Sequence, residues 1–131
     1  MTAREDPDAA FARGMSAASA SAYGEAAEHF LVAIGLSPLH FEAQNQLFFI
    51  AGSVPRHEAK QVLDAWAWVM GGASLTETTA KVSAGWSDQP AGRVALRQLA
   101  RALARAEAFE ESIESLTAGT VDVNATESSF T

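Results

Sequence analysis

The stretch that decides the fold is residues 23–38, with the sequence YGEAAEHFLVAIGLSP. Small and apolar residues recur along it at helical spacing: Ala26, Phe30, Ala33 and Ile34. Ser37 and Pro38 follow, and proline cannot continue a helix because it lacks the backbone N–H and its ring clashes with the preceding turn. Residues 23–36 are therefore predicted to form an amphipathic helix that buries one face.

The whole chain has the composition of one small helical domain. It has 131 residues and no cysteine, and its four prolines lie where a helix can begin or end. Without cysteine it forms neither a disulfide nor a thiolate metal site, which suits a reducing compartment. The acidic N-terminus lacks the apolar core of a secretory signal, and no apolar run approaches the roughly 20 residues that span a bilayer. We expect a soluble, cytoplasmic protein that does not span a membrane.

The chain is acidic, with nine lysines and arginines against 16 aspartates and glutamates, and a formal net charge of −7. Nonspecific binding of nucleic acid requires several cationic contacts with phosphate, so this balance argues against a nucleic-acid partner. A net negative charge favours solubility but identifies no partner.

Further helices are predicted on both sides of this stretch, bounded by prolines, glycines and capping residues. They span about residues 8–20, a segment beginning at Phe41, and about residues 55–70, 75–84, 91–106 and 108–118. Ser74 and Glu77 have the spacing of a capping box, in which each side chain bonds a free backbone amide of the first helical turn. Residues 120–131 are rich in threonine and serine and are predicted to form a mobile tail, or one that becomes ordered against a partner.

Several positions in the first two predicted helices match a known repeat. Counted from Pro7, the eighth, twentieth, twenty-fourth, twenty-seventh and thirty-second positions hold Gly14, Ala26, Phe30, Ala33 and Pro38, with Tyr23 at the turn. This pattern resembles the tetratricopeptide repeat, a helix–turn–helix unit of 34 residues. Ala10 and Arg13 depart from it, because the family carries a large aromatic residue and a leucine in those positions.

The resemblance continues, less regularly, over residues 7–119. A second unit begins at Phe41 and carries Trp66 where the family has alanine, and the register returns at 93–118. The resemblance implies an all-α fold in which antiparallel helix hairpins stack as a short, irregular array of about six to seven helices, within one domain at 1–119. Another bundle of paired helices could carry the same motifs. Repeats need neighbours to cover their faces, so self-association, or truncation from a longer protein, is expected.

No group of residues has the spacing of a catalytic or metal site. His57 and Glu58 begin a zinc-protease motif, but Gln61 stands where the second histidine is required. His29 and His40 have no ligand partner at a useful spacing, and no glycine-rich loop carries the lysine of a phosphate-binding loop. We therefore expect no catalytic residue, no metal and no cofactor, and predict that the chain is not an enzyme.

Four of the nine basic residues follow one another at four-residue spacing: Arg93, Arg97, Arg101 and Arg105. Each step of four advances about 40° around a helix, so the guanidinium groups are predicted to form one slowly curving ridge. One interpretation is that the ridge is solvated or pairs with glutamates that follow it, which would stabilise the protein little. These are Glu107, Glu110, Glu111 and Glu114.

The other interpretation is that the ridge belongs to a ligand groove. The resemblance implies that the fifth and ninth positions of each first helix line a concave face, and they hold Phe11, Met15, Asn45, Phe49, Arg97 and Arg101. Apolar side chains, an amide and two cations would suit an extended or helical peptide that carries a carboxylate, because arginine binds carboxylates through paired hydrogen bonds. The lysines and asparagines of relatives that clamp a C-terminal carboxylate are incomplete here, so no such clamp is predicted.

The three tryptophans, Trp66, Trp68 and Trp86, form a second candidate surface, and Trp66 and Trp68 are its predicted partner-binding residues. Trp66 and Trp68 are two residues apart, about 200° around a helix, and cannot both face one core. One of them is expected to be exposed, or covered by the helix predicted at 75–84 or by another protein, because tryptophan is a frequent interface anchor. Core packing is the alternative for either one singly.

These features favour a non-catalytic scaffold for protein–protein interaction, or a subunit of a larger assembly. Its partner would be another protein or peptide, bound in the groove or at the tryptophans, and a homo-oligomer is a further option. The alternative is a helical accessory segment of a larger enzyme, because similar repeats often precede catalytic domains.

Overall fold

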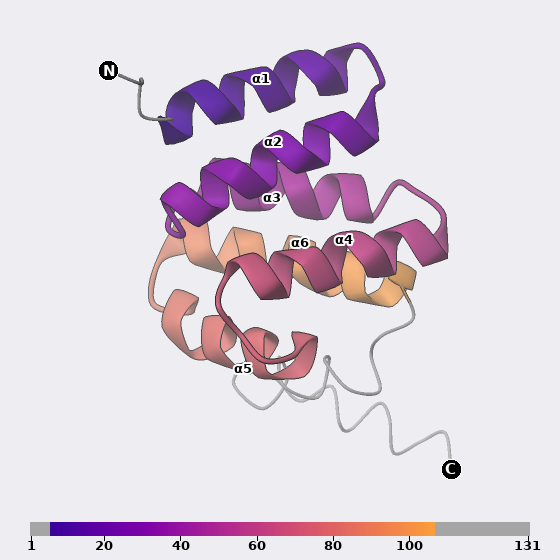
Figure 1. The fold of residues 1–131 in the computed structure, drawn as a ribbon. Coiled ribbons are helices and arrows are strands. Elements are labelled where there is room, and N and C mark those ends of the chain that lie inside the picture. Colours follow the sequence, from indigo (N-terminus) through magenta and orange to yellow (C-terminus); the bar gives the residue numbers. More distant parts are fainter. Residues whose placement is uncertain (1–5, 107–131) are drawn as a thin grey trace.

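The computed structural model describes residues 6–106, which fold into six α-helices (Figure 1). In chain order they are α1 (Pro7–Ser19), α2 (Tyr23–Leu36), α3 (Phe41–Ala51), α4 (Arg56–Val69), α5 (Leu75–Trp86) and α6 (Pro90–Ala106). No strand occurs within this described range. The predicted all-α fold is confirmed, and each helix expected in this range forms close to its predicted bounds. The expected helix at 108–118 and the tail at 120–131 lie outside the described residues.

Helices α1 and α4 end in the same way. After each, two backbone amides, those of Ser21 and Ala22 and those of Gly71 and Gly72, donate to carbonyls of the last helical turn. This is a Schellman motif, which needs one residue in the left-handed backbone region. Gly71 takes that conformation with φ 83°, and Ser21 takes it with φ 62° although its side chain disfavours it.

The beginning of α5 carries the predicted cap. Ser74 Oγ accepts a hydrogen bond from the backbone amide of Glu77 at 3.0 Å, as a capping box requires. The carboxylate of Glu77 accepts at 2.6 Å from the amide of Ala73, one residue earlier than the capping box specifies. Two free amides at the start of the helix are thereby satisfied.

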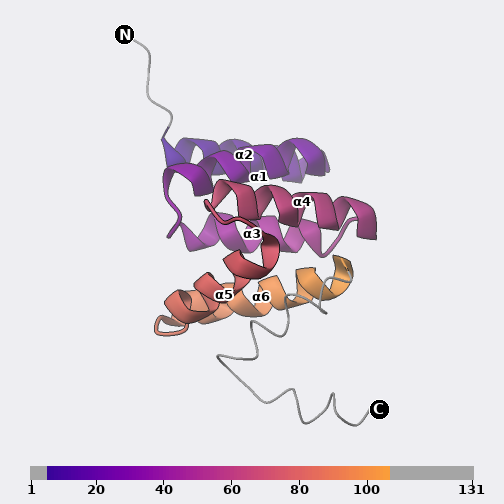
Figure 2. The same cartoon turned by 60° about the horizontal axis from the view of Figure 1, so that its bottom comes forward.

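The helices run in two opposite directions. Figure 1 shows α1, α3 and α6 running one way across the molecule, and α2 and α4 running back. Successive helices in the pairs α1–α2 and α3–α4 are thus antiparallel hairpins, and Figure 2 shows the two hairpins stacked above α6. Helices α3 and α6 pack side by side in the same direction. The start of α3 therefore lies near the start of α6, and the end of α3 near the end of α6.

Two close contacts hold the hairpins together. In the first hairpin Gly14 lies against the ring of Phe30, so closely that a Cβ on Gly14 would lie 2.5 Å from Phe30 Cε1. In the second, the completely buried indole of Trp66 packs edge-on against Phe48 and donates a hydrogen bond to Gln44. The core thus continues through both hairpins into α6, where Leu99 and Leu103 are fully buried.

Helix α5 does not belong to either of these hairpins. It packs against α4 and α6, at the end of the stack opposite the first hairpin (Figure 1). Trp86 at its end is buried and meets Phe41 edge-on, with ring centroids 5.3 Å apart. The backbone of Trp86 also approaches Gly92 so closely that a Cβ there would collide with the Trp86 carbonyl oxygen. The small Gly92 therefore lets the α5–α6 turn fold back onto the start of α6.

Candidate functional site

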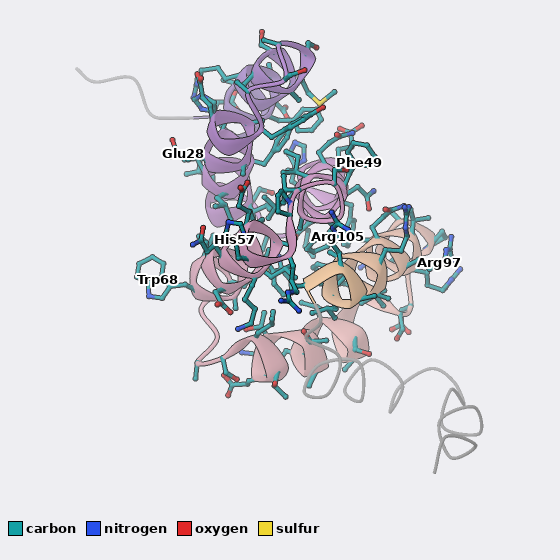
Figure 3. The ribbon with its side chains drawn as sticks, turned by 90° about the vertical axis from the view of Figure 1, so that its right-hand side faces the viewer. Glu28, Phe49, His57, Trp68, Arg97 and Arg105 are labelled. Atoms are coloured by element: carbon teal, nitrogen blue, oxygen red, sulfur yellow. The ribbon has the colours of Figure 1, made fainter. Side chains whose placement is uncertain are left out.

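The outer surface of α3 and α6 carries four of the predicted partner-binding residues: Asn45, Phe49, Arg97 and Arg101. We call this surface the arginine face. The side chain of Phe49 is 53% exposed, and both arginines are exposed. Figure 3 shows Phe49 and Arg97 projecting on the same side of the molecule, from α3 and α6 respectively.

The contacts of neighbouring residues fix the alignment of this face. At one end Phe41, which begins α3, packs on Trp86 just before α6. At the other end the Nε of Arg105 donates to the carbonyl oxygen of Val54, just after α3. The two contacts thus align α3 and α6 start to start and end to end.

The arginines at the two ends of the arginine ridge form hydrogen bonds with the backbone of the protein itself. Arg93 donates to the carbonyl oxygen of Ser87 at 2.9 Å, and Arg105 donates to that of Val54 at 2.9 Å. Within residues 6–106, no hydrogen bond or ion pair is found for Arg97 or Arg101. The glutamates from Glu107 onward, the other predicted partners of the ridge, lie outside the described residues. The middle of the ridge therefore presents two guanidinium groups to solvent.

Asn45 lies one helical turn before Phe49 and is half-buried. Its Oδ1 is buried and accepts no hydrogen bond within the part of the chain that the structure describes. A buried acceptor without a donor costs about 1–3 kcal/mol of stability. Within the described residues, the Asn45 carbonyl oxygen is thus left without a donor.

The two groove residues predicted on α1 differ from each other. Phe11 is half-buried, with its ring centroid 5.6 Å from that of Phe30 and 5.0 Å from that of His40. Met15 keeps 37% of its surface exposed. Since α1 packs mainly on α2, these residues are not part of the arginine face. Phe11 contributes chiefly to packing of the first hairpin.

The two tryptophans of α4 have opposite environments. Trp66 is completely buried, so the prediction that it binds a partner is wrong: its indole fills the core between α3 and α4 and bonds Gln44. Trp68 is 80% exposed, as one of the two had to be. It projects from the side of the molecule opposite Arg97 (Figure 3).

A groove between α2 and α4 was not predicted from the sequence. Its apolar lining includes Leu31 and Val62, and its polar lining includes Glu28, His57 and Glu58. We call it the acidic groove. It lies on the same side as Trp68, because Figure 3 shows Glu28, His57 and Trp68 all projecting away from the arginine face.

The sequence held a partial signal for the acidic groove. Glu28 and Leu31 lie three residues apart on α2, and Glu58 and Val62 lie four residues apart on α4, so each pair shares one face of its helix. Only the parallel packing of α2 beside α4 makes them two walls of one groove. A Cβ on Gly35 would lie 3.4 Å from Val69, which shows how closely the two helices approach beyond the groove.

The described residues offer no arrangement that suggests metal chemistry. Among residues 6–106 no group of three or more histidines, aspartates and glutamates is placed to hold a metal ion. His40 instead serves the fold: its Nδ1 accepts from the amide of Ala43 at 3.1 Å and its Nε2 lies 3.1 Å from the carboxylate of Asp8. None of the helices in this range combines the length and apolarity that crossing a membrane requires.

Comparison of the chain with protein-family models, with curated proteins and with solved structures finds no match. The geometry of the two faces is therefore the basis for a functional proposal.

Proposed function

We propose that this chain is a non-catalytic protein-interaction domain that binds a partner segment on its arginine face. The observation that carries the proposal is the exposed ring of Phe49 on the same face as two guanidinium groups for which the described fold provides no carboxylate. The segment would carry at least one carboxylate for Arg97 or Arg101 and an apolar side chain for Phe49.

The backbone around the arginine face supports this role. Both helices are anchored at each end, by the Phe41–Trp86 contact and the Arg105–Val54 hydrogen bond. A partner therefore meets side chains on two fixed helices, which reduces the conformational entropy lost on binding. The alternation of helix directions in α1–α4 and α6 also supports a repeat-like scaffold of the tetratricopeptide kind.

Arginine is well suited to this task. Its planar guanidinium can donate two hydrogen bonds to one carboxylate, and such charge-assisted bonds are roughly twice as strong as neutral ones. Arg97 and Arg101 are one helical turn apart. Each can therefore bind one of two carboxylates that are separated by the same distance on a helical or extended partner.

Capture of partners from an extract of the cells that express the protein tests the proposal. The wild type is compared with Arg97→Glu/Arg101→Glu, and each captured partner is then titrated against the purified chain. We expect this variant to bind at least about tenfold more weakly with unchanged helix content. Lys81→Glu, an exposed charge reversal on α5, is the control.

A second pair of variants separates apolar contact from charge. Phe49→Ser removes the exposed ring of the arginine face, whereas Val32→Ser removes an exposed apolar side chain from α2. Only the first should weaken binding. Equal affinities of the wild type, Phe49→Ser and the arginine variant would disprove the proposed site. A captured enzyme whose activity depends on the chain would favour the accessory-segment alternative.

A further inference from the structure

The acidic groove has the chemistry that the arginine face would bind. Glu28 and Glu58 supply carboxylates from α2 and α4, and Leu31 and Val62 supply apolar surface between them. Of the two carboxylates, Glu58 lies 3.8 Å from the Nε2 of His57, with both side chains at least half exposed. Within the described residues no ion pair is found for Glu28. The groove therefore offers acid and apolar contacts together.

The arginine face offers the complement. Arg97 and Arg101 supply two cations one helical turn apart, and Phe49 and Val94 supply exposed apolar groups on either side of the α3–α6 boundary. Neither arginine uses its charge within residues 6–106. The basic groups of the arginine face are thus complementary in charge to the carboxylates of the acidic groove, and both surfaces also carry apolar side chains.

The two faces cannot meet within one molecule. Figure 3 shows Phe49 and Arg97 on one side, and Glu28 and His57 on the other. The helical core lies between them, so only another copy can bring the two faces into contact.

We propose that the acidic groove of one copy binds the arginine face of a second copy. This inference rests on the proposed function and names the partner of that same face. The contact joins two different surfaces, so it is heterologous: each copy keeps one free arginine face or one free groove, and association continues until a ring closes or a filament forms.

The contact relies on exposed charges at a modest surface, so it is expected to be weak and to need high protein concentration.

Sedimentation velocity over a range of protein concentrations tests the proposal. The wild type should show mass rising with concentration beyond that of a monomer. Glu28→Arg/Glu58→Arg and Arg97→Glu/Arg101→Glu should each raise the dissociation constant by at least about tenfold. The two variants change the net charge in opposite directions, so general repulsion between acidic copies cannot explain a loss in both.

Mixing the two variants provides the decisive measurement. Each retains one native face, so the native arginines of the groove variant can bind the native groove of the other variant. Association should return in the mixture. Mixtures that stay monomeric, or single variants that associate like the wild type, would overturn the proposal.

Two controls complete the experiment. Glu25→Arg makes the same charge reversal on α2 as Glu28→Arg does. Glu25 lines the hollow between α1 and α2, so its reversal should leave association unchanged. Should either reversal reduce helix content, Glu28→Gln/Glu58→Gln and Arg97→Gln/Arg101→Gln repeat the test with neutral side chains. A wild type that stays monomeric refutes self-association by itself. The proposed function then stands if Arg97→Glu/Arg101→Glu still loses a different captured partner, and both fail if it loses none.

Discussion

The indole N–H of Trp66 donates a hydrogen bond to Oε1 of Gln44 across 2.7 Å, and both residues are completely buried. The Nε2 of Gln44 donates to the carbonyl oxygen of Pro38 at 2.9 Å and lies 3.5 Å from the sulfur of Met70. One amide thereby satisfies the polar atom that tryptophan brings into the core and ties α3 to α4 and to the loop before α3.

Replacing Gln44 with leucine should destabilise the protein. The change leaves the buried N–H of Trp66 without an acceptor, so the free energy of unfolding in urea should fall by about 1–3 kcal/mol. Gln61→Leu, at an exposed position of α4, should change it by less than about 0.5 kcal/mol.

A double-mutant cycle isolates the contribution of this hydrogen bond. Trp66→Phe removes the donor, so it should cost less in the Gln44→Leu background than in the wild type. Strictly additive losses would show that the bond contributes nothing to stability.

Helix positions were predictable because their signals are local. Proline, glycine and capping residues act within one turn, as Ser74 does at the start of α5. The orientation of Trp66 was not predictable in this way. The helical angle requires that Trp66 and Trp68 face opposite directions, but the choice between them depends on Gln44, 22 residues earlier in the chain.

The two faces were predictable to different degrees. Arg97 and Arg101 follow from spacing within one helix, whereas their alignment with Phe49 depends on α6 packing in parallel beside α3, with α5 between them in sequence. The acidic groove needs two helices separated by α3, so no local pattern reveals it. Which distant helices pack side by side depends on the whole core, so it could not be predicted from the sequence.

Gly14→Ala should weaken the first hairpin. Its new methyl group would lie 2.5 Å from one ring carbon of Phe30 and 2.6 Å from another, so α1 and α2 must move apart or the ring must shift. Overpacking of this kind costs about 1–3 kcal/mol, measured by thermal or urea unfolding. In contrast, a Cβ on Gly24 meets nothing within 4 Å, and Gly24→Ala should leave stability unchanged or raise it by up to about 1 kcal/mol. Equal effects of the two substitutions would contradict the close contact.

Ser21→Gly should stabilise the protein. Ser21 adopts φ 62° at the end of α1, a backbone conformation that costs a residue with a Cβ about 1 kcal/mol. Glycine removes this cost but gains more freedom in the unfolded chain, so a net gain of up to about 1 kcal/mol in the free energy of unfolding is expected. Ser19→Gly, within the last turn of α1, has no left-handed backbone to relieve and should cost about 0.5–1 kcal/mol. A loss of stability for Ser21→Gly would argue that its side chain does more than the φ angle indicates.

Trp68 should dominate the solvent-accessible fluorescence of the protein. Of the three tryptophans, Trp66 and Trp86 are buried, whereas Trp68 is 80% exposed. Trp68→Ala should therefore remove most of the emission that acrylamide quenches in dilute solution and change the free energy of unfolding by less than about 0.5 kcal/mol. Trp66→Ala should instead cost about 3–5 kcal/mol, because it empties the centre of the α3–α4 hairpin. Unchanged quenching after Trp68→Ala would mean that the indole is already covered in solution, and a repeat of the measurement at lower protein concentration would show whether another copy covers it.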